Sequence, residues 1–273
     1  MSNIKEMLSK LTISFPAFAV IVIILFIIIP FPAIVLDIFI RINLLFAILI
    51  LLIILNTKKI TDFSFLPAIL LISTVFTLAI NISIVRTILS GGAEYDGKII
   101  RFLSNLIAGS GDMIQLWIGF AVFYLFLFIE VVIITKGGTR AAEVAARWTL
   151  DAMQIRMLAI ETEFSAGVIT EEQAQIKKLE IQKESDFYGS LDGAMKFISG
   201  NTKVTIFIIF LLILSGTVID YLLREAALFE ALKTYIQLSI GCGFIFLLPI
   251  FIISLAVGIS VTRLISSINE KGK

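Results

Sequence analysis

Residues 113–153 read MIQLWIGFAVFYLFLFIEVVIITKGGTRAAEVAARWTLDAM, and the change of character within this stretch decides the fold. The first part, 113–134, is apolar apart from Gln115 and Glu130, and about 20 such residues cross the roughly 30 Å hydrocarbon core of a bilayer as a helix. The second part opens a polar stretch, 135–203, which holds nine of the chain's 22 Lys and Arg residues. This junction predicts a transmembrane helix that leads into a large polar loop.

Apolar runs of similar length recur along the chain, in which 59% of the 273 residues are hydrophobic. They lack the alternation of apolar and polar residues that marks the strands of a membrane barrel. We therefore predict an all-α, polytopic helical membrane protein whose six spans are 13–29, 33–55, 65–89, 113–134, 204–223 and 235–260. The spans form a first transmembrane part (1–134) and a second (204–273), joined by a helical loop (135–203).

Two of these runs need separate interpretation. The first lacks a small-residue cleavage site, so we read it as a retained span rather than a signal peptide. The last contains Gly241, Gly243 and Pro249. It is either one kinked helix or two broken pieces, and the sequence leaves both open.

The residue types present exclude several kinds of chemistry. The chain has no His, and its single Cys242 lies in an apolar run, so it can form no intrachain disulfide. No spacing typical of a nucleotide site, a nucleophile–base pair or a metal site is present. We expect no enzyme activity, no cofactor, no metal and no nucleic-acid partner, and the composition indicates a lipid bilayer as the surroundings.

The distribution of Lys and Arg predicts the orientation. With six spans, sixteen of these cations fall on the side of the two tails, residues 56–64 and the 135–203 loop, and four fall on the other side. In membrane proteins the loops rich in Lys and Arg lie in the cytoplasm. Both termini and the 135–203 loop are therefore expected there, and residues 90–112 are expected on the opposite side.

The polar loop itself is expected to be helical. Gly137-Gly138 would end the fourth span, and residues 139–163 are rich in strong helix formers. Ala166-Gly167 would break this helix, and Thr170 with Gln173 has the spacing of a capping box that starts a second helix, running to about Phe187. Asp192-Gly193 then indicates a turn before the next span.

A few polar side chains interrupt the spans. Glu130 lies about one turn inside the fourth span, where an ionisable group is a functional candidate; the alternative is that it turns toward Lys136 at the interface. Asp37 and Arg41, four residues apart, are expected to neutralise each other, and Asp220 to reach water. Three further sets are read as helix-packing positions: Thr74, Thr77 and Asn81; Ser239 and Gly243; Ser254 and Gly258.

The loop resembles one protein family. Its residues include Arg140, Ala142-Glu143-Val144, Ala146-Arg147-Trp148, Thr149-Leu150-Asp151, Asp186-Phe187-Tyr188-Gly189 and Asp192-Gly193-Ala194. This order is similar to the signature of the FHIPEP family, the FlhA/SctV-type export-gate proteins of flagellar and injectisome type III secretion. The similarity extends over nearly the whole chain and corresponds to the transmembrane half of a family member.

The resemblance implies a subunit of a bacterial inner-membrane apparatus that helps couple the proton motive force to protein export. It also implies a homo-oligomeric ring, contacts with other export-apparatus membrane subunits, and exported proteins as cargo. The signature charges are then candidate sites, either as a surface for ions or neighbouring subunits or as ordinary exposed ion pairs: Arg140, Glu143, Arg147, Asp151, Asp186 and Asp192.

The sequence departs from the family pattern at three positions inside or beside the spans. Thr77 stands where the family usually has arginine, and Asn201 and Cys242 stand where it usually has aspartate. These changes remove groups that could bind or relay protons. Two alternatives to a complete export gate therefore stay open: a reduced relative that acts in assembly or regulation without proton coupling, and a free-standing ion channel or transporter.

Overall fold

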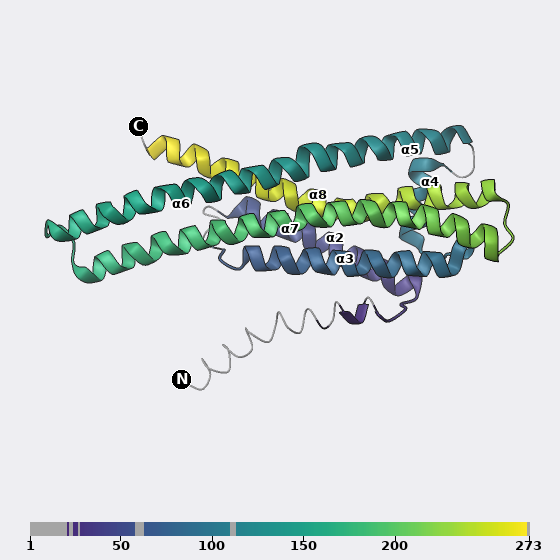
Figure 1. Cartoon of the computed structure of the whole chain (residues 1–273), viewed down its shortest axis with the longest axis horizontal. Helices are drawn as coiled ribbons and strands as arrows, with labels where there is room; N and C mark the ends of the chain where they lie inside the picture. The colour runs from purple at the N-terminus through teal and green to yellow at the C-terminus, as the bar shows by residue number, and fades with distance from the viewer. Residues whose placement is uncertain (1–20, 22–23, 27, 58–62, 110–112, 272–273) are drawn as a thin grey trace.

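The structure is a computed structural model that describes residues 21, 24–26, 28–57, 63–109 and 113–271. The described residues are almost entirely helical and contain no strand. The elements are α2 (Ala33–Asn56), α3 (Leu66–Gly91), η2 (Gly92–Glu94), α4 (Lys98–Ala108), α5 (Met113–Phe128), the π-helical segment η3 (Ile129–Thr135), α6 (Lys136–Ser165), α7 (Glu171–Leu223) and α8 (Leu228–Lys271). They form an elongated bundle from which one long hairpin of α6 and α7 projects (Figure 1).

The described part of the chain contains five helical segments long and apolar enough to cross a membrane. They lie within 33–56, 66–94, 113–165, 171–223 and 228–259, and they include five of the six predicted spans. The predicted polytopic helical fold is thereby confirmed. The remaining predicted span, 13–29, lies mostly outside the described residues.

Two long helices carry the membrane bundle into the polar loop without a break. The helical segment 113–165 and α7 each contain 53 residues. The predicted breaks at Gly137-Gly138 and at Asp192-Gly193 are therefore wrong. Gly138 lets α6 approach α8, since a Cβ there would lie 3.2 Å from the carbonyl oxygen of Ser254. Asp192 accepts a hydrogen bond from Lys196 at 2.8 Å, an i,i+4 pair that supports helix through Gly193.

The tip of the hairpin forms as predicted. Gly167 adopts φ +70, which favours glycine, directly after α6 ends. The Thr170 hydroxyl accepts a hydrogen bond from the Gln173 amide at 3.3 Å, and the Gln173 side chain accepts one from the Thr170 amide at 3.0 Å. This reciprocal pair is the predicted capping box at the start of α7.

Helix α8 occupies the centre of the bundle and packs against every other described α-helix and against η3. It is one continuous helix through Pro249, which settles the choice that the sequence left open. Small residues permit close contacts: a Cβ on Gly241 would lie 2.6 Å from the Ile100 carbonyl oxygen, and one on Gly243 would meet the Phe123 ring. Gly258 has no such neighbour within 4 Å.

Helix α4, absent from the sequence prediction, lies against α8 and α5. Its first amides are capped from α2, because the buried Asp37 carboxylate accepts hydrogen bonds from Lys98 N at 2.8 Å and Ile99 N at 3.3 Å. The predicted Asp37–Arg41 pair is wrong, since no such ion pair occurs in the described part of the chain. The side of α4 that packs against the bundle carries Ile99, Ile100, Leu103 and Ile107, whereas Phe102 and Leu106 are exposed.

The end of the bundle far from the hairpin is closed by a polar contact between three helices. Asp220 is 4% exposed and accepts a hydrogen bond from the Tyr235 hydroxyl at 2.9 Å, so its predicted exposure to water is wrong. Arg224 pairs with Asp220 and donates to the carbonyl oxygens of Leu89 at 3.1 Å and Ser90 at 2.7 Å. A cation at the last carbonyls of a helix is favourable, so Arg224 joins the end of α3 to the α7–α8 connection.

Candidate functional site

A cluster of polar side chains lies buried where the apolar bundle meets the hairpin. We call it the buried polar cluster; its members are Glu130, Thr135, Asn201, Thr202 and Thr205. Each is at most 2% exposed. Glu130 and Thr135 belong to η3, the other three to α7, and η3 packs against both α7 and α8.

Hydrogen bonds divide these side chains into two groups, one that crosses from η3 to α7 and one that lies along α7. The Thr135 hydroxyl donates to Glu130 Oε1 at 2.7 Å and lies 3.5 Å from the Thr202 hydroxyl oxygen. Along α7, the Thr205 hydroxyl donates to Asn201 Oδ1 at 3.5 Å. The π-helical turn brings Thr135, five residues after Glu130, onto the carboxyl group.

Two polar atoms of the cluster have no hydrogen-bond partner among the described residues. They are Glu130 Oε2 and Asn201 Nδ2. Leaving buried polar groups unpaired is costly, and such groups in a native protein commonly mark a functional site. At membrane depth the unpartnered carboxyl oxygen can bind water or exchange a proton, and the unpartnered amide can bind water.

The structure shows that the Glu130 side chain does not turn toward Lys136. The Glu130 carboxyl is held by Thr135, whereas the Lys136 side chain is exposed at the start of α6. Glu130 therefore stays inside the bundle instead of reaching the interface with Lys136. The sequence identified Glu130 as the only carboxylate of its predicted span, but the contact between Thr135 and Thr202 carried no recognisable signal, since these residues are 67 positions apart.

The three departures from the family pattern all fall on buried positions. Asn201 is part of the buried polar cluster. Cys242 is fully buried in α8. The Thr77 hydroxyl donates to the Asn43 side chain at 3.1 Å and to the Ser73 carbonyl at 2.9 Å, so it ties α3 to α2.

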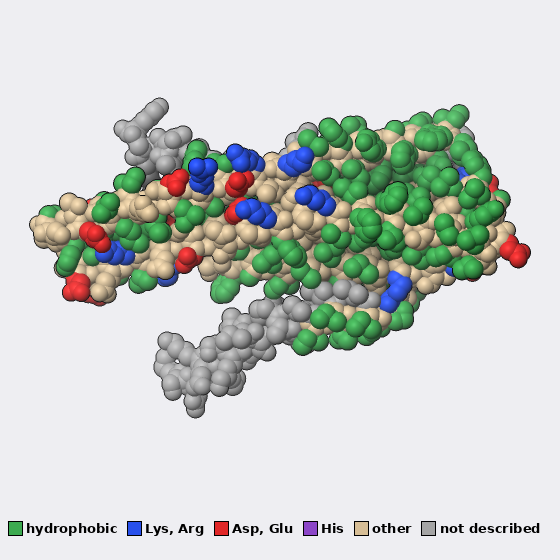
Figure 2. Space-filling model, viewed as in Figure 1, with side chains coloured by type: hydrophobic (Ala, Val, Ile, Leu, Met, Phe, Trp, Pro, Cys, Tyr) green, Lys and Arg blue, Asp and Glu red, His purple; other side chains and the backbone are tan. Residues whose placement is uncertain are grey.

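The signature charges lie on the surface of the hairpin, where Figure 2 shows blue and red side chains gathered while the opposite half of the molecule is mostly green. Arg140 pairs with Glu143 at 3.1 Å, and Arg147 with Asp151 at 3.9 Å. Both pairs are well exposed and therefore weak. The hydrogen bond from Lys196 to Asp192, with the charge of that carboxylate, raises the pKa of Lys196.

Three further ion pairs join the two helices of the hairpin. They are Arg156–Glu184 at 2.8 Å, Lys177–Glu163 at 2.6 Å and Lys178–Glu161 at 3.1 Å. They fix the pairing of α6 with α7 beyond the bundle, where few large side chains are buried. The predicted capping box and these pairs together give the hairpin a defined geometry.

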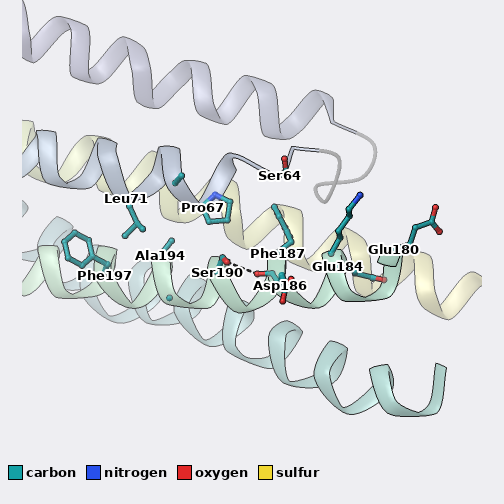
Figure 3. Close-up of a pocket in the computed structure, with 13 residues that line it drawn as sticks. Ser64, Pro67, Leu71, Glu180, Glu184, Asp186, Phe187, Ser190, Ala194 and Phe197 are labelled. Atoms are coloured by element: carbon teal, nitrogen blue, oxygen red, sulfur yellow. Dashed lines mark hydrogen bonds between the residues drawn. The ribbon is translucent and has the colours of Figure 1, made fainter. Parts of the chain in front are cut away.

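A groove of about 950 Å³ lies between the start of α3 and the N-terminal half of α7. Pro67 and Leu71 of α3 and Phe187 and Phe197 of α7 line it, as Figure 3 shows. Asp186, one of the predicted site residues, lies on its rim, together with the charged residues Glu180, Lys183 and Glu184. Sequence reasoning missed the groove, because nothing in the sequence indicates that α3 begins beside this part of α7.

No three His, Cys, Asp or Glu side chains come together as a metal site within the part of the chain that the structure describes. The buried polar cluster is the candidate site for proton or water binding, and the hairpin offers a charged surface and a groove.

Comparison with known proteins identifies relatives of the whole described bundle. The chain matches the FHIPEP family over residues 23–272. It is 44% identical over 252 residues to the flagellar biosynthesis protein FlhA of Treponema pallidum, covering 92% of this chain and 36% of that protein. Identity to FlhA of Borreliella burgdorferi is 43% over 239 residues, covering 88% and 34%, and to FlhA of Bacillus subtilis 38% over 251 residues, covering 92% and 36%.

The chain thus spans about a third of the length of these curated relatives. No solved structure matches it significantly. The family match covers the membrane bundle and the hairpin with its signature charges, as the sequence resemblance predicted. The chain belongs to the FHIPEP family.

Proposed function

We propose that this chain is a membrane subunit of a flagellar protein export apparatus of the type III class. The observation that carries the proposal is the match to FHIPEP over residues 23–272, with relatives that are named flagellar biosynthesis proteins. The hairpin carries the charges on which the family resemblance rests, namely Arg140, Glu143, Arg147, Asp151, Asp186 and Asp192. A bundle of apolar helices with a long charged hairpin suits a protein that joins a membrane pore to partners in the cytoplasm.

The chain takes part in coupling the proton motive force to export, and the buried polar cluster supports this. Charging a carboxyl group inside a membrane is costly, so Glu130 exchanges its proton only when its surroundings change. Its unpartnered Oε2 atom provides the place where a proton or a water molecule binds. Thr135, which donates to Glu130, lies 3.5 Å from the Thr202 hydroxyl of α7, so a relative movement of η3 and α7 would alter the surroundings of the carboxyl group.

A second candidate function is favoured by the two departures Asn201 and Cys242. A buried amide and a buried thiol carry no charge and relay protons poorly. On this account the chain is a reduced relative, which serves assembly or regulation of the export apparatus without proton coupling. Proton flux through the purified protein separates the two functions.

The distribution of Lys and Arg residues supports a membrane location and an orientation for the chain. We place the chain in the bacterial inner membrane with both termini and the α6–α7 hairpin in the cytoplasm, because sixteen Lys and Arg residues fall on that side and four on the other. The exposed apolar faces of α2, α5 and α7 then contact lipid or other membrane subunits of the apparatus. Exported proteins and further copies of the chain, in a homo-oligomeric ring, are the remaining partners.

Secretion by the host tests the proposal. Deleting the gene should leave the filament protein inside the cell and remove it from the medium and the cell surface, and returning the gene on a plasmid should restore secretion. Filament protein is measured by immunoblot in cell and medium fractions, and a cytoplasmic enzyme serves as the lysis control. Secretion at the normal level in the deletion strain would contradict an export role.

A further inference from the structure

We infer that Lys136 and Lys203 bind the phosphate group of an anionic phospholipid, whose acyl chains lie on the apolar surface beside them. We call these two residues the lysine pair. The inference rests on the membrane location proposed above, and it concerns a surface outside the buried polar cluster. The lipid is then a bound ligand of the chain rather than only its surroundings.

The two lysines lie at the same level of two neighbouring helices. Lys136 directly follows Thr135 and Lys203 directly follows Thr202, and the hydroxyl oxygens of these threonines are 3.5 Å apart. Helices α6 and α7 run antiparallel as the two arms of the hairpin (Figure 1). In two antiparallel right-handed helices, the residues that follow a facing pair turn to the same side. The lysine pair therefore shares one side of the hairpin, at its base.

Both lysine side chains point away from the centre of the bundle, and both residues are exposed. Two residues along an α-helix turn the side-chain direction by about 200°. Two residues after Lys136, Gly138 packs against the Ser254 carbonyl of α8. Two residues after Lys203, Thr205 is fully buried. Each lysine is thus opposite a residue that faces the interior.

The lysine pair lacks the carboxylate partners that neighbouring cations have. Farther along the hairpin, Arg140 pairs with Glu143 at 3.1 Å and Lys196 pairs with Asp192 at 2.8 Å. Within the part of the chain that the structure describes, neither member of the lysine pair takes part in an ion pair. Two like charges side by side repel each other, and an anion bound between them offsets this repulsion. The charge of the pair therefore favours an anionic ligand.

The lysine pair lies at the boundary between apolar and charged surface. The apolar segment 113–134 ends just before Lys136, and the apolar segment 204–223 begins directly after Lys203. Each segment has about the length that crosses the hydrocarbon core as a helix, which places the two lysines at the depth of the lipid headgroups. Figure 2 shows Lys and Arg side chains where the apolar half of the molecule begins. Basic sites between transmembrane helices at this depth bind anionic headgroups.

Large apolar side chains extend from the lysine pair toward the centre of the bilayer. Phe207 and Phe210 of α7 are 61% and 62% exposed, and Val132 of η3 is 40% exposed. Phe207 and Phe210 follow Lys203 at i+4 and i+7, so the three residues share one face of α7. A phosphate group between the lysines places its acyl chains along this face. The combination of cations and exposed apolar side chains fits a phospholipid better than a small hydrophilic anion.

The site should distinguish phospholipids by their net charge. A zwitterionic headgroup such as phosphatidylcholine carries its own ammonium group, which the lysines repel, whereas phosphatidylglycerol presents only the phosphate charge. A Lys near an anionic headgroup strengthens binding about fivefold, so the lysine pair should contribute about thirtyfold.

Native mass spectrometry of the detergent-purified full chain measures this preference by titration with phosphatidylglycerol and with phosphatidylcholine of the same acyl chains. The unmodified chain should bind phosphatidylglycerol more tightly. Lys136→Ala and Lys203→Ala should each weaken that binding about fivefold and together about thirtyfold, without changing the binding of phosphatidylcholine. Replacing both lysines by arginine keeps the charge and should retain the preference.

The matched control is Lys177→Ala combined with Lys178→Ala. This variant removes the same charge from α7 near the tip of the hairpin, where the two lysines pair with Glu163 and Glu161. It should bind phosphatidylglycerol as the unmodified chain does. An equal loss of binding in this variant would show that only the net charge matters and would overturn the site.

Glycerol 3-phosphate separates a lipid site from a simple phosphate site. It carries the phosphate without acyl chains, so a large excess should leave phosphatidylglycerol bound, because the apolar contacts hold the lipid. Displacement of the lipid by this compound would overturn the assignment of a phospholipid.

Secretion by the host separates failure of this site from failure of the proposed function. Normal secretion by the deletion strain would contradict the export role, whereas the lipid titration uses only the purified chain. Equal binding of the two lipids, or a preference that the double alanine variant keeps, would overturn the lipid site and leave the export role intact. Lowered secretion by the double alanine variant without a lipid preference would show that the lysines bind a protein partner and would also overturn the proposal.

Discussion

The Asp37 carboxylate in α2 accepts a hydrogen bond from the backbone amide of Lys98, 61 residues later, at 2.8 Å. This bond fixes the start of α4 against the bundle, and a second bond from Ile99 at 3.3 Å supports it. Asp37 is 4% exposed, so the cap replaces contacts with water that the carboxylate loses on burial. A residue that looks like a charge in a span is thus a helix cap.

Removing this cap should destabilise the protein. Asp37→Ala deletes the acceptor for two helix amides and should cost about 1 kcal/mol of unfolding free energy or more, while Asp37→Asn keeps one acceptor oxygen and should cost less. The melting temperature in detergent is followed with a thiol-reactive dye, because unfolding exposes the buried Cys242. Glu94→Gln, at an exposed position nearby, is the control. Equal melting temperatures for Asp37→Ala and the wild type would contradict the capping role.

Two adjacent glycines should respond oppositely to substitution. Gly137 has no atom within 4 Å of an added Cβ, so Gly137→Ala should stabilise α6 by up to about 1 kcal/mol. At Gly138 an added Cβ would lie 3.0 Å from Met195 Cε and 3.2 Å from the Ser254 carbonyl, so Gly138→Leu should separate α6 from α8 and destabilise the protein. The same dye assay measures both variants. A Gly138→Leu protein as stable as Gly137→Ala would show that the close approach does not exist.

Labelling of introduced cysteines should report the orientation. An impermeant thiol reagent applied to intact cells should label Ser90→Cys, near the end of α3, and spare Ser165→Cys at the hairpin tip. Both positions are exposed, so both should react once the cells are permeabilised. The reverse pattern in intact cells would place the hairpin outside the cytoplasm.

If the chain is the reduced relative without proton coupling, proton flux in reconstituted vesicles should be low for the unmodified chain. A buried amide at 201 and a buried thiol at 242 relay protons poorly, so Asn201→Asp combined with Cys242→Asp should raise the flux several-fold if Glu130 completes the path. A pH-sensitive dye inside the vesicles follows the flux, and Asn201→Leu with Cys242→Ala is the control. Robust flux through the unmodified chain, unchanged by the added aspartates, would remove the reduced-relative alternative.

The sequence predicted those parts of the fold that local patterns encode. The apolar runs located five described spans, and the Thr170–Gln173 spacing located the start of α7. Gly137-Gly138 and Asp192-Gly193 were misread as breaks, because glycine has a low helix propensity that packing and side-chain pairs override. At Gly138 the overriding contact is with Ser254, far along the chain.

The candidate site was predictable only in part. Glu130 was identifiable as a rare carboxyl in an apolar run, and the hairpin charges as members of a family signature. The partners that give Glu130 its geometry were not, since Thr135 and Thr202 become neighbours only when η3 and α7 pack together. The α3–α7 groove is hidden for the same reason, because its walls come from helices that are far apart in the sequence.

Secretion by strains that carry Glu130 variants tests the central claim most directly, namely that the buried polar cluster serves protein export. Glu130→Gln preserves shape and the acceptor for Thr135 but cannot release a proton, so it should lower secreted filament protein about tenfold or more at an unchanged level of the membrane protein. Glu130→Asp, which keeps the carboxyl, should retain a substantial part of secretion, and Thr162→Ala on the exposed end of α6 should retain all of it. Wild-type secretion by the Glu130→Gln strain would contradict the account.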